Sequence, residues 1–372
     1  MRVILVGGGT AGHINPALAL AEYIKKQDIN NKILYIGAKN NMEENLVKQA
    51  GFDFRGITIS GFSRKLSLDS VKKNLITFKN LIISSFESRK ILKEFNPDIC
   101  IGTGGYVCGP FLMQAHKLKI PFLIHDSNSF PGVTTKLLAK VSNQVLISNK
   151  EAEKYLPKNI KITVTGTPVR EKIISYNTLN KQESRQKLGI TNNLPVILSF
   201  GGSLGSSVIN NLMLEIMLKN DNYNFIHGFG KKNSSFSEEI KKNCDILNNS
   251  RYIIKEYIDN MPECLAAADL VICRAGATSI SEIQAAYKPA ILIPSPNVAE
   301  NHQFYNSLTL VKSNCASMIE EKDLNYNKLL TEINNIINTK KSEEYVNNLK
   351  KNSDININSS KKIYNIIKDI LK

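Results

Sequence analysis

Three glycine-rich segments are candidates for binding a phosphorylated ligand. Each follows a short apolar run, at residues 7–12, 102–105 and 201–205. Glycine lets the backbone pass close to a ligand, and free N–H groups at a helix entrance attract negative charge. One such segment could be only a tight turn between a strand and a helix. Three of them favour loops that converge at the carboxyl ends of parallel strands, where open α/β sheets bind ligands.

The first segment formally satisfies the GxGxxG pattern of dinucleotide-binding proteins through Gly7, Gly9 and Gly12. A nicotinamide dinucleotide site also needs an acidic residue at the end of the second strand, to bind the ribose hydroxyls. Here the apolar run 34–36 continues into Gly-Ala-Lys at 37–39, without an acid. This departure argues against a nicotinamide-dependent dehydrogenase.

His13 ends the first segment and is a candidate for proton transfer. An imidazole gains and loses a proton near neutral pH, which suits a general base. A histidine at a helix entrance can equally hydrogen-bond a substrate or cap backbone groups, and the sequence leaves both roles open. We predict structural roles for His116 and His227, and loop-shaping roles near the binding crevice for His125 and His302.

The sequence lacks the patterns that usually hold a metal ion. No Asp-x-Asp motif occurs, so neither a metal nor another cofactor is expected to hold a diphosphate. The charge of a phosphorylated leaving group would then be met by the glycine loops, by Ser203 and by the cation of Arg170. The six cysteines form no CxxC pair and no zinc-type spacing with histidine, and we interpret them as buried thiols.

Two α/β units must position these residues. Strand-like runs alternate with helical patterns and restart after residues 165–168, which predicts parallel sheets wrapped by helices. The predicted strands are 3–6, 32–36, 98–101, 122–125 and 144–148, then 196–200, 224–227, 252–254, 270–273 and 290–293. We predict an α/β fold with two Rossmann-like domains, residues 1–164 and 165–345. The segment 346–372 should end in a helix with one buried face, which could pack on either domain.

Length, charge and hydropathy narrow the function further. A chain of 372 residues exceeds the usual size of one hydrophobic core, which supports two domains. Subtracting 33 acidic from 48 basic side chains gives +15, a balance that favours polyanions: nucleic acid, anionic lipid surfaces or phosphorylated substrates. No apolar run reaches the roughly 20 residues of a membrane-spanning helix, and the opening run is too short for a secretory signal. No zinc finger, helix-turn-helix or aromatic RNA platform is recognisable, so nucleic acid is not an expected partner.

An amphipathic helix with a basic border is predicted from Leu68 onward. Its apolar stripe is Val71, Leu75, Phe78, Ile82 and Phe86, flanked by Arg64, Lys65, Lys72, Lys73 and Lys79. We favour the interpretation that this stripe packs on the sheet. Phe62, Ile76 and Ile83 extend the apolar surface beyond one stripe, and an apolar patch beside basic residues is typical of binding to anionic lipid.

Several segments, taken in order, carry a family resemblance. They are Thr-Ala-Gly-His at 10–13, Gly-Gly-Tyr at 104–106, His-Asp-Ser-Asn at 125–128, Gly-Thr-Pro-Val-Arg at 166–170, Gly-Gly-Ser at 201–203, Arg-Ala-Gly-Ala-Thr at 274–278 and Asn-His-Gln at 301–303. Together they resemble the MurG family of peptidoglycan N-acetylglucosaminyltransferases. The resemblance runs from residue 1 to about residue 306.

The resemblance implies a GT-B fold, in which two Rossmann-like domains face each other across a deep cleft. The N-terminal domain would bind the acceptor, and the C-terminal domain would bind the donor. The implied reaction is inverting: the C4 hydroxyl of the N-acetylmuramoyl unit of Lipid I attacks UDP-N-acetylglucosamine, giving Lipid II and UDP. Because a polyprenyl-linked acceptor stays in the bilayer, the implied location is the cytoplasmic face of the cell membrane, as a peripheral protein.

The resemblance also implies roles for individual residues. Ser203 would contact the diphosphate, the Ile258 backbone would read the uracil edge, and Glu282 would bind the ribose hydroxyls. The remaining implied donor contacts are Thr10, Ala11, Gly12, Asn128, Arg170, Ala277, Thr278 and Gln303. The implied acceptor contacts are Gly104, Gly105 and Tyr106, with His13 as the candidate general base.

The sequence departs from the commonest wording of the family in three places. Ala11 replaces a frequent glycine, Asp126-Ser127 stands where Glu-Gln is common, and Ser206 stands where alanine is usual. The alternatives are another GT-B enzyme with a different lipid acceptor or sugar, a UDP-N-acetylglucosamine 2-epimerase, and a non-catalytic nucleotide-binding protein. An epimerase would release free sugar without a lipid, and a binding protein would transfer no sugar.

Overall fold

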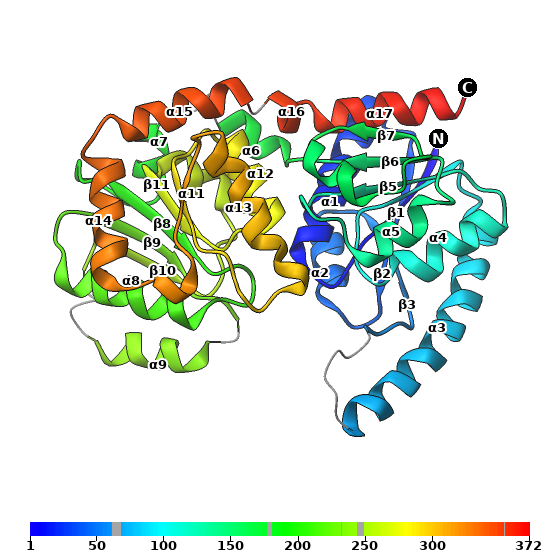
Figure 1. Cartoon of the computed structure of the whole chain (residues 1–372), viewed down its shortest axis with the longest axis horizontal. Helices are drawn as coiled ribbons and strands as arrows, with labels where there is room; N and C mark the ends of the chain where they lie inside the picture. Colours follow the sequence, from blue (N-terminus) through cyan, green and yellow to red (C-terminus); the bar gives the residue numbers. More distant parts are fainter. Residues whose placement is uncertain (62–67, 177–180, 232, 244–248, 353) are drawn as a thin grey trace. The chain divides into compact units, whose positions relative to one another are not determined.

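The computed structural model describes residues 1–61, 68–176, 181–231, 233–243, 249–352 and 354–372. The chain divides into two compact units. The first comprises Met1–Arg170 together with Ile355–Lys372, and the second comprises Glu171–Asp354. Each unit is built on its own parallel β-sheet (Figure 1).

The first unit holds a seven-stranded sheet in the order β3-β2-β1-β4-β5-β6-β7. Its strands are β1 (Arg2–Val6), β2 (Lys32–Ala38), β3 (Asp53–Ile57), β4 (Ile99–Gly102), β5 (Phe122–Asp126), β6 (Gln144–Ile147) and β7 (Ile162–Val164). Its helices are α1 (Ala11–Gln27), α2 (Met42–Gln49), α3 (Leu68–Phe95), α4 (Cys108–Lys117), α5 (Val133–Ala139), the 3-10 turn η1 (Lys150–Tyr155), α16 (Asp354–Ile357, whose first residue falls in the second unit) and α17 (Ser359–Ile370).

Both faces of this sheet are covered, because the strands alternate between two hydrophobic clusters. In β1, Val3 and Leu5 join the cluster that contains α1 and α17 residues, whereas Ile4 and Val6 join the cluster that contains α4 and α5 residues. Side chains that alternate between two buried faces give a strand that is apolar throughout. This burial explains why the central strands were predictable from apolar runs.

The terminal helix α17 packs on the first unit. Ile363 and Ile367 are fully buried in the same cluster as α1, and the rings of Tyr23 and Tyr364 meet edge to face. Residues around the start of α17 also contact the segment 165–167. Asn356 Oδ1 accepts a hydrogen bond from the Thr167 N–H at 2.9 Å, and Ser359 Oγ donates to the Gly166 carbonyl at 3.0 Å. Residues 165–167 therefore belong to the first unit, although the sequence placed them at the start of the second domain.

The exposed face of α3 is the reverse of the one expected. Leu75, Phe78 and Phe86 are 68%, 59% and 72% exposed, and Ile82 is also exposed, whereas the buried positions are Thr77, Ser84, Ser88, Ile91 and Leu92. Ser84 and Ser88 tolerate burial because their hydroxyls donate to the Leu81 and Ser84 carbonyls of the same helix. The expectation that the apolar stripe packs on the sheet is therefore wrong for its described residues. Phe62, Arg64 and Lys65 lie outside the described residues, as do the side chains of Val71, Lys72 and Lys73.

The second unit holds a six-stranded sheet in the order β10-β9-β8-β11-β12-β13. Its strands are β8 (Val196–Phe200), β9 (Asn224–Gly228), β10 (Tyr252–Lys255), β11 (Leu270–Cys273), β12 (Ala290–Leu292) and β13 (Ser317–Met318). Its helices are α6 (Glu171–Tyr176), α7 (Lys181–Lys187), α8 (Ser207–Lys219), α9 (Ser234–Lys242), α11 (Met261–Ala267), α12 (Ala277–Ala285), α13 (His302–Lys312), α14 (Tyr326–Ile337) and α15 (Lys341–Asn352), with the 3-10 turns η2 (Ala299–Asn301) and η3 (Glu321–Asp323).

Candidate functional site

The first glycine loop links the end of β1 to the start of α1. Gly9 adopts a positive φ of 84°, which favours glycine, and a side chain on Gly7 would clash with the Thr103 hydroxyl. Thr10 is the N-cap residue of the 17-residue helix α1, and Ala11 and Gly12 open its first turn. The predicted donor contacts Thr10, Ala11 and Gly12 thus stand at a helix N-terminus, which can bind an anion or a polar hydroxyl.

His13 lies in the first turn of α1 with its imidazole fixed by the loop. Its Nδ1 is 2.9 Å from the Gly8 carbonyl oxygen, and the Thr10 hydroxyl is 3.4 Å from the same nitrogen. A carbonyl can only accept a hydrogen bond, so Nδ1 of the neutral ring carries the proton and Nε2 keeps its lone pair. The geometry therefore leaves Nε2 able to accept a proton, as a general base must.

The second glycine loop lies against His13. A side chain built on Gly104 would stand 2.6 Å from His13 Cδ2 and 2.9 Å from Nε2, and one on Gly105 would clash with the Gly8 carbonyl. Both glycines have positive φ, 112° and 89°. The hydroxyl of Tyr106 accepts a hydrogen bond from Asn41 Nδ2 at 2.9 Å, and burial raises the pKa of that hydroxyl. The predicted acceptor contacts and the candidate base thus come together in one unit.

Glu43 is a residue of this region that sequence reasoning missed. It lies in the first turn of α2 and is fully buried. Its Oε1 accepts a hydrogen bond from the Ala38 N–H at 2.9 Å, and its Oε2 accepts one from the Gly9 N–H at 3.4 Å. The available signal was an acidic residue in the first turn of a helix. That signal is common on exposed helices, so it does not reveal burial.

Asn128 follows β5 and is held by the carboxylate of Asp126. Asp126 Oδ1 accepts from the backbone and side-chain nitrogens of Asn128 at 3.0 and 3.2 Å. Its Oδ2 accepts from the Gly132 N–H at 2.9 Å and from the Thr135 hydroxyl at 2.7 Å. The aspartate at this departure from the family wording therefore organises the turn that presents Asn128.

His125 and His227 are buried strand residues. His125 Nε2 lies 2.8 Å from the Gly166 carbonyl oxygen, and burial lowers the pKa of His125. Burial also lowers the pKa of His227, to about 4, and its Nδ1 lies 2.8 Å from the Ser199 hydroxyl. Both rings are consequently uncharged at neutral pH. His116 is exposed on α4, and His302 begins α13.

The third glycine loop follows β8 in the second unit. Gly202 and Gly205 have positive φ, 87° and 82°, and the loop ends at Ser206, the N-cap residue of the 13-residue helix α8. Ser206 Oγ accepts from the Ile209 N–H at 3.5 Å. The predicted diphosphate contact Ser203 lies half-buried within the loop, one turn before this helix N-terminus. A loop of this form supplies N–H donors for a phosphate group.

Arg274 fastens this loop to the neighbouring strand ends. One terminal nitrogen donates to Ser206 Oγ at 2.7 Å, and the other donates to the Ile293 and Pro294 carbonyls, each at 3.3 Å. The guanidinium also forms an ion pair with Glu321. Arg274 belongs to the family-like segment, but the sequence assigned it no role. Its contacts show a brace behind the third loop.

The other predicted donor contacts follow the remaining strands of this sheet. Ala277 and Thr278 open α12 after β11, and Glu282 lies one turn further along that helix with an exposure of 8%. Ile258 follows β10 and is buried. Gln303 lies in the first turn of α13, where its Oε1 accepts from the Ser295 N–H at 2.9 Å. Parallel strands present these residues along the carboxyl edge of one sheet.

Arg170 is the last residue of the first unit before the second begins. The donor contacts predicted in the second unit are thus Ser203, Ile258, Ala277, Thr278, Glu282 and Gln303. Those in the first unit are Thr10, Ala11, Gly12, Asn128 and Arg170. Within the described residues, no group of three or more His, Cys, Asp or Glu side chains is placed to hold a metal ion.

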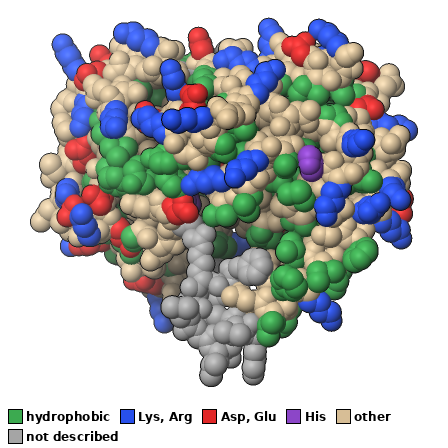
Figure 2. All heavy atoms as spheres, turned by 45° about the vertical axis from the view of Figure 1, so that its right-hand side comes forward, with side chains coloured by type: hydrophobic (Ala, Val, Ile, Leu, Met, Phe, Trp, Pro, Cys, Tyr) green, Lys and Arg blue, Asp and Glu red, His purple; other side chains and the backbone are tan. Residues whose placement is uncertain are grey.

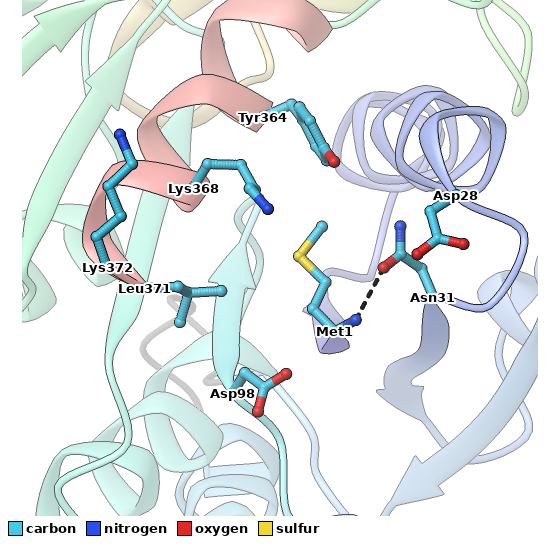
Figure 3. Close-up of a pocket in the computed structure, with 8 residues that line it drawn as sticks. All are labelled: Met1, Asp28, Asn31, Asp98, Tyr364, Lys368, Leu371 and Lys372. Carbon is cyan, nitrogen blue, oxygen red and sulfur yellow. Dashed lines mark hydrogen bonds between the residues drawn. The ribbon is translucent and has the colours of Figure 1, made fainter.

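A hollow of about 540 Å³ lies at the amino ends of the strands of the first sheet, whereas the glycine loops lie at the carboxyl ends (Figure 3). It is lined by Met1, Asp28, Asn31, Asp98, Tyr364, Lys368, Leu371 and Lys372. The chain-terminal amine donates to Asn31 Oδ1 at 2.9 Å, and Asp98 accepts from the Arg2 N–H at 2.7 Å. These contacts secure the amino ends of β1 and β4, away from the glycine loops that follow the same strands.

Comparison with known proteins supplies the family. Relatives named UDP-N-acetylglucosamine–N-acetylmuramyl-(pentapeptide) pyrophosphoryl-undecaprenol N-acetylglucosamine transferase match over the whole chain. The one from Acetivibrio thermocellus is 41% identical, covering 100% of this chain and 99% of the relative, and the one from Ruminiclostridium cellulolyticum is 42% identical, covering 100% of both. This chain belongs to the MurG family. Residues 3–147 match the glycosyltransferase family 28 N-terminal domain, and residues 196–370 match its C-terminal domain.

Solved structures agree with the fold predicted for a MurG family member. The crystal structure of Acinetobacter baumannii MurG has a TM-score of 0.70 at 23% identity, covering 99% of each chain. The S. aureus MnaA–UDP co-structure has a TM-score of 0.69 at 13% identity, covering 100% of this chain and 97% of the other. At these identities the likeness shows the fold alone. The predicted pair of Rossmann-like domains with parallel sheets is confirmed.

Proposed function

We propose that this protein transfers N-acetylglucosamine from UDP-N-acetylglucosamine to the C4 hydroxyl of the N-acetylmuramoyl unit of Lipid I, forming Lipid II and UDP. The observation that carries the proposal is the match over the whole chain, at 41% identity, to a relative named for this transfer. The glycine loops, His13 and the helix N-termini of both units supply the chemistry that such a transfer needs.

The proposed reaction is a single displacement with inversion. The C4 oxygen of the acceptor forms a bond to the anomeric carbon, and the bond from that carbon to the β-phosphate oxygen breaks. His13 Nε2 takes the hydroxyl proton, since Nδ1 already donates to the Gly8 carbonyl. UDP leaves with the electron pair of the broken bond. Backbone N–H groups of the third loop, the helix that follows it, and Ser203 stabilise its added negative charge.

The proposed donor contacts divide by chemistry. Glu282 accepts hydrogen bonds from the ribose hydroxyls, the backbone at Ile258 reads the uracil edge, and the start of α12 at Ala277 and Thr278 offers N–H donors. Gln303 and Asn128 orient the sugar hydroxyls, and Arg170 lies near the nucleotide. On the acceptor side, the Gly104–Gly105 turn and Tyr106 bind the substrate beside His13, which the contacts of the second loop support.

We also propose that the protein binds the cytoplasmic face of the cell membrane through α3 and α5. Exposed apolar side chains on these helices include Leu75, Phe78, Ile82, Phe86, Val133 and Leu137. Lys79, Lys136 and Lys140 add positive charge. Hydrophobic and basic side chains lie next to one another on the face of the molecule shown in Figure 2. An apolar surface with basic residues binds anionic lipid, at about 1 kcal/mol per Lys or Arg. No helix among the described residues is both long and apolar enough to cross a bilayer.

Transfer of labelled N-acetylglucosamine from its UDP donor to a short-chain Lipid I analogue tests the proposed reaction. We expect product only when acceptor is present, with a β linkage that nuclear magnetic resonance can identify. Formation of UDP-N-acetylmannosamine without acceptor, or of free N-acetylmannosamine and UDP where water also cleaves the bond to the phosphate, would instead indicate an epimerase. Absence of any turnover, with donor still bound, would indicate a nucleotide-binding protein.

A further inference from the structure

The peptide group between Gly8 and Gly9 is hydrogen-bonded at both ends. Its carbonyl oxygen lies 2.9 Å from His13 Nδ1, and its N–H donates to Glu43 Oε2 at 3.4 Å. These two polar groups belong to one planar, conjugated peptide unit, so a hydrogen bond to the N–H alters the electron density on the carbonyl oxygen. Glu43, the peptide group and His13 therefore form one continuous hydrogen-bonded chain.

Two glycines leave room for the buried side chain of Glu43. A side chain on Gly8 would clash with Glu43 Oε1, and one on Gly37 would clash with its Cγ. Burying a carboxylate is expensive unless it is hydrogen-bonded, and here both oxygens accept backbone N–H groups. No ion pair to Glu43 is found among the described residues. The N-terminus of α2 adds a favourable dipole.

We propose that Glu43 is a positioning residue for His13 and acts on it through the Gly8–Gly9 peptide group. By accepting from the N–H, the carboxylate polarises the peptide and makes its carbonyl a better acceptor, since hydrogen bonds in a chain strengthen one another. A stronger carbonyl acceptor holds the proton on Nδ1 and stabilises the imidazolium that forms when Nε2 takes a proton. In serine proteases an aspartate performs this task by direct contact with the histidine.

The proposal rests on the proposed role of His13 as general base. The other titratable groups near the loop are Tyr35 on β2 and Tyr106 and Cys108 beside the second loop. Burial raises the pKa of each, that of Cys108 to about 12, so all three are uncharged near neutral pH. Tyr35 donates to the Gly7 carbonyl at 3.1 Å. The carboxylate of Asp126 also acts on Cys108, but its oxygens accept from Asn128, Gly132 and Thr135. Glu43 is thus the carboxylate that belongs to this hydrogen-bonded chain.

The charge of Glu43 can be removed with little change in shape by Glu43→Gln. Its matched control is Glu44→Gln, since Glu44 is the next residue of the same helix but is paired with Lys48 at 2.7 Å on the surface. We expect the imidazole titration of His13, followed by nuclear magnetic resonance of protein labelled with ¹³C-histidine, to move to lower pH by about half a unit in Glu43→Gln. It should not move in Glu44→Gln. The His13→Gln spectrum assigns the signal among the five histidines.

The pH dependence of kcat/KM for the Lipid I analogue gives the second readout. Its acidic limb should move to lower pH by the same amount in Glu43→Gln, with a plateau about tenfold lower, because a weaker base transfers the proton less well. A purely structural role for Glu43 would lower the plateau and leave the limb in place. An unmoved titration and limb, or equal shifts in Glu44→Gln, would overturn the proposal.

A second variant covers poor folding of Glu43→Gln. Glu43→Asp keeps the charge, and we expect a titration shift less than half that of Glu43→Gln; an equal or larger shift would count against charge as the cause. If Glu43→Gln does not fold, a His13 titration in Glu43→Asp that moves by half a unit or more contradicts the proposal. If His13 is not the general base, His13→Ala would retain transfer, while the His13 titration would still move in Glu43→Gln. That combination separates failure of the proposed function from failure of the proposal about Glu43.

Discussion

The first and third glycine loops occupy equivalent places and are braced by opposite charges. Each follows a central strand of its sheet, β1 or β8, and each opens a long helix. Behind the first loop lies Glu43, a buried carboxylate that accepts from two backbone N–H groups. Behind the third loop lies Arg274, whose guanidinium is paired with Glu321 and bonded to Ser206.

This difference matches the charge that each loop would meet in the proposed reaction. A base becomes positive when it accepts a proton. A buried carboxylate that is linked to it by two hydrogen bonds through one peptide group therefore stabilises it. A diphosphate becomes more negative when it leaves, so a carboxylate without a partner behind its loop would oppose the reaction. The ion pair of Arg274 and Glu321 fixes the third loop without adding net negative charge.

The largest effect is expected from His13→Ala. Transfer should fall by about 10² to 10⁴, the usual contribution of a general base, while UDP-N-acetylglucosamine binding measured by calorimetry stays the same. His116→Ala is the matched control, because it makes the same substitution on an exposed face of the same unit. Unchanged transfer in His13→Ala would show that the first loop does not hold the general base. The charge behind that loop would then have no catalytic meaning.

Arg274→Lys tests the brace of the third loop. Lysine carries the charge but cannot make the separate bonds to Ser206 Oγ and to the Ile293 and Pro294 carbonyls. We expect the KM for the donor to rise about tenfold, while the KM for the acceptor stays constant. Arg251→Lys serves as control, since Arg251 pairs with Asp221 at the surface of the same unit. A selective rise in the acceptor KM would show that the two loops do not divide the substrates as proposed.

The sequence predicted the glycine loops, but it did not predict the roles of Glu43 and Arg274, which hold the first and third loops. Glycines, strands and helix starts leave local patterns, and buried central strands such as β1 and β8 are continuous apolar runs. The short strands β3, β7 and β13 escaped notice, because sheet-edge strands keep exposed and polar side chains, as in Asp53–Ile57. Burial of Glu43, and the exposure of the apolar face of α3, depend on contacts between distant segments. Periodicity identifies an apolar face but not what that face contacts.

The membrane-binding surface provides a smaller test in the first unit. Phe86→Glu should weaken binding to vesicles of anionic phospholipid about tenfold, since it removes an exposed apolar side chain that the lipid would bury and adds charge repulsion. Ile29→Glu is the control, because Ile29 is equally exposed, at 72%, but follows α1 rather than lying on α3. Transfer to a water-soluble acceptor should be the same in both variants. Equal loss of vesicle binding in both would indicate general charge rather than a surface centred on α3.

The smallest expected effect concerns charge buried away from the loops. Lys288, at the amino end of β12, donates to the Ala266 and Ala268 carbonyls, each at 3.0 Å, and desolvation beside Lys181 lowers its pKa to about 8. Because the unfolded chain holds this proton up to its ordinary pKa of 10.5, the free energy of unfolding should rise between about pH 8 and 10.5. The slope from one group is at most about 1.4 kcal/mol per pH unit.

Urea unfolding at several pH values, compared with Lys288→Met, isolates this contribution from that of other lysines and tyrosines. In that pH window the variant should lose the rise in the free energy of unfolding. It should keep the donor KM of the parent, because Lys288 lies at the amino ends of the strands and the third loop lies at their carboxyl ends. A donor KM that changed with Lys288 would mean that charge at the amino edge reaches the loops. The contrast between Glu43 and Arg274 could then no longer be assigned to the residues directly behind each loop.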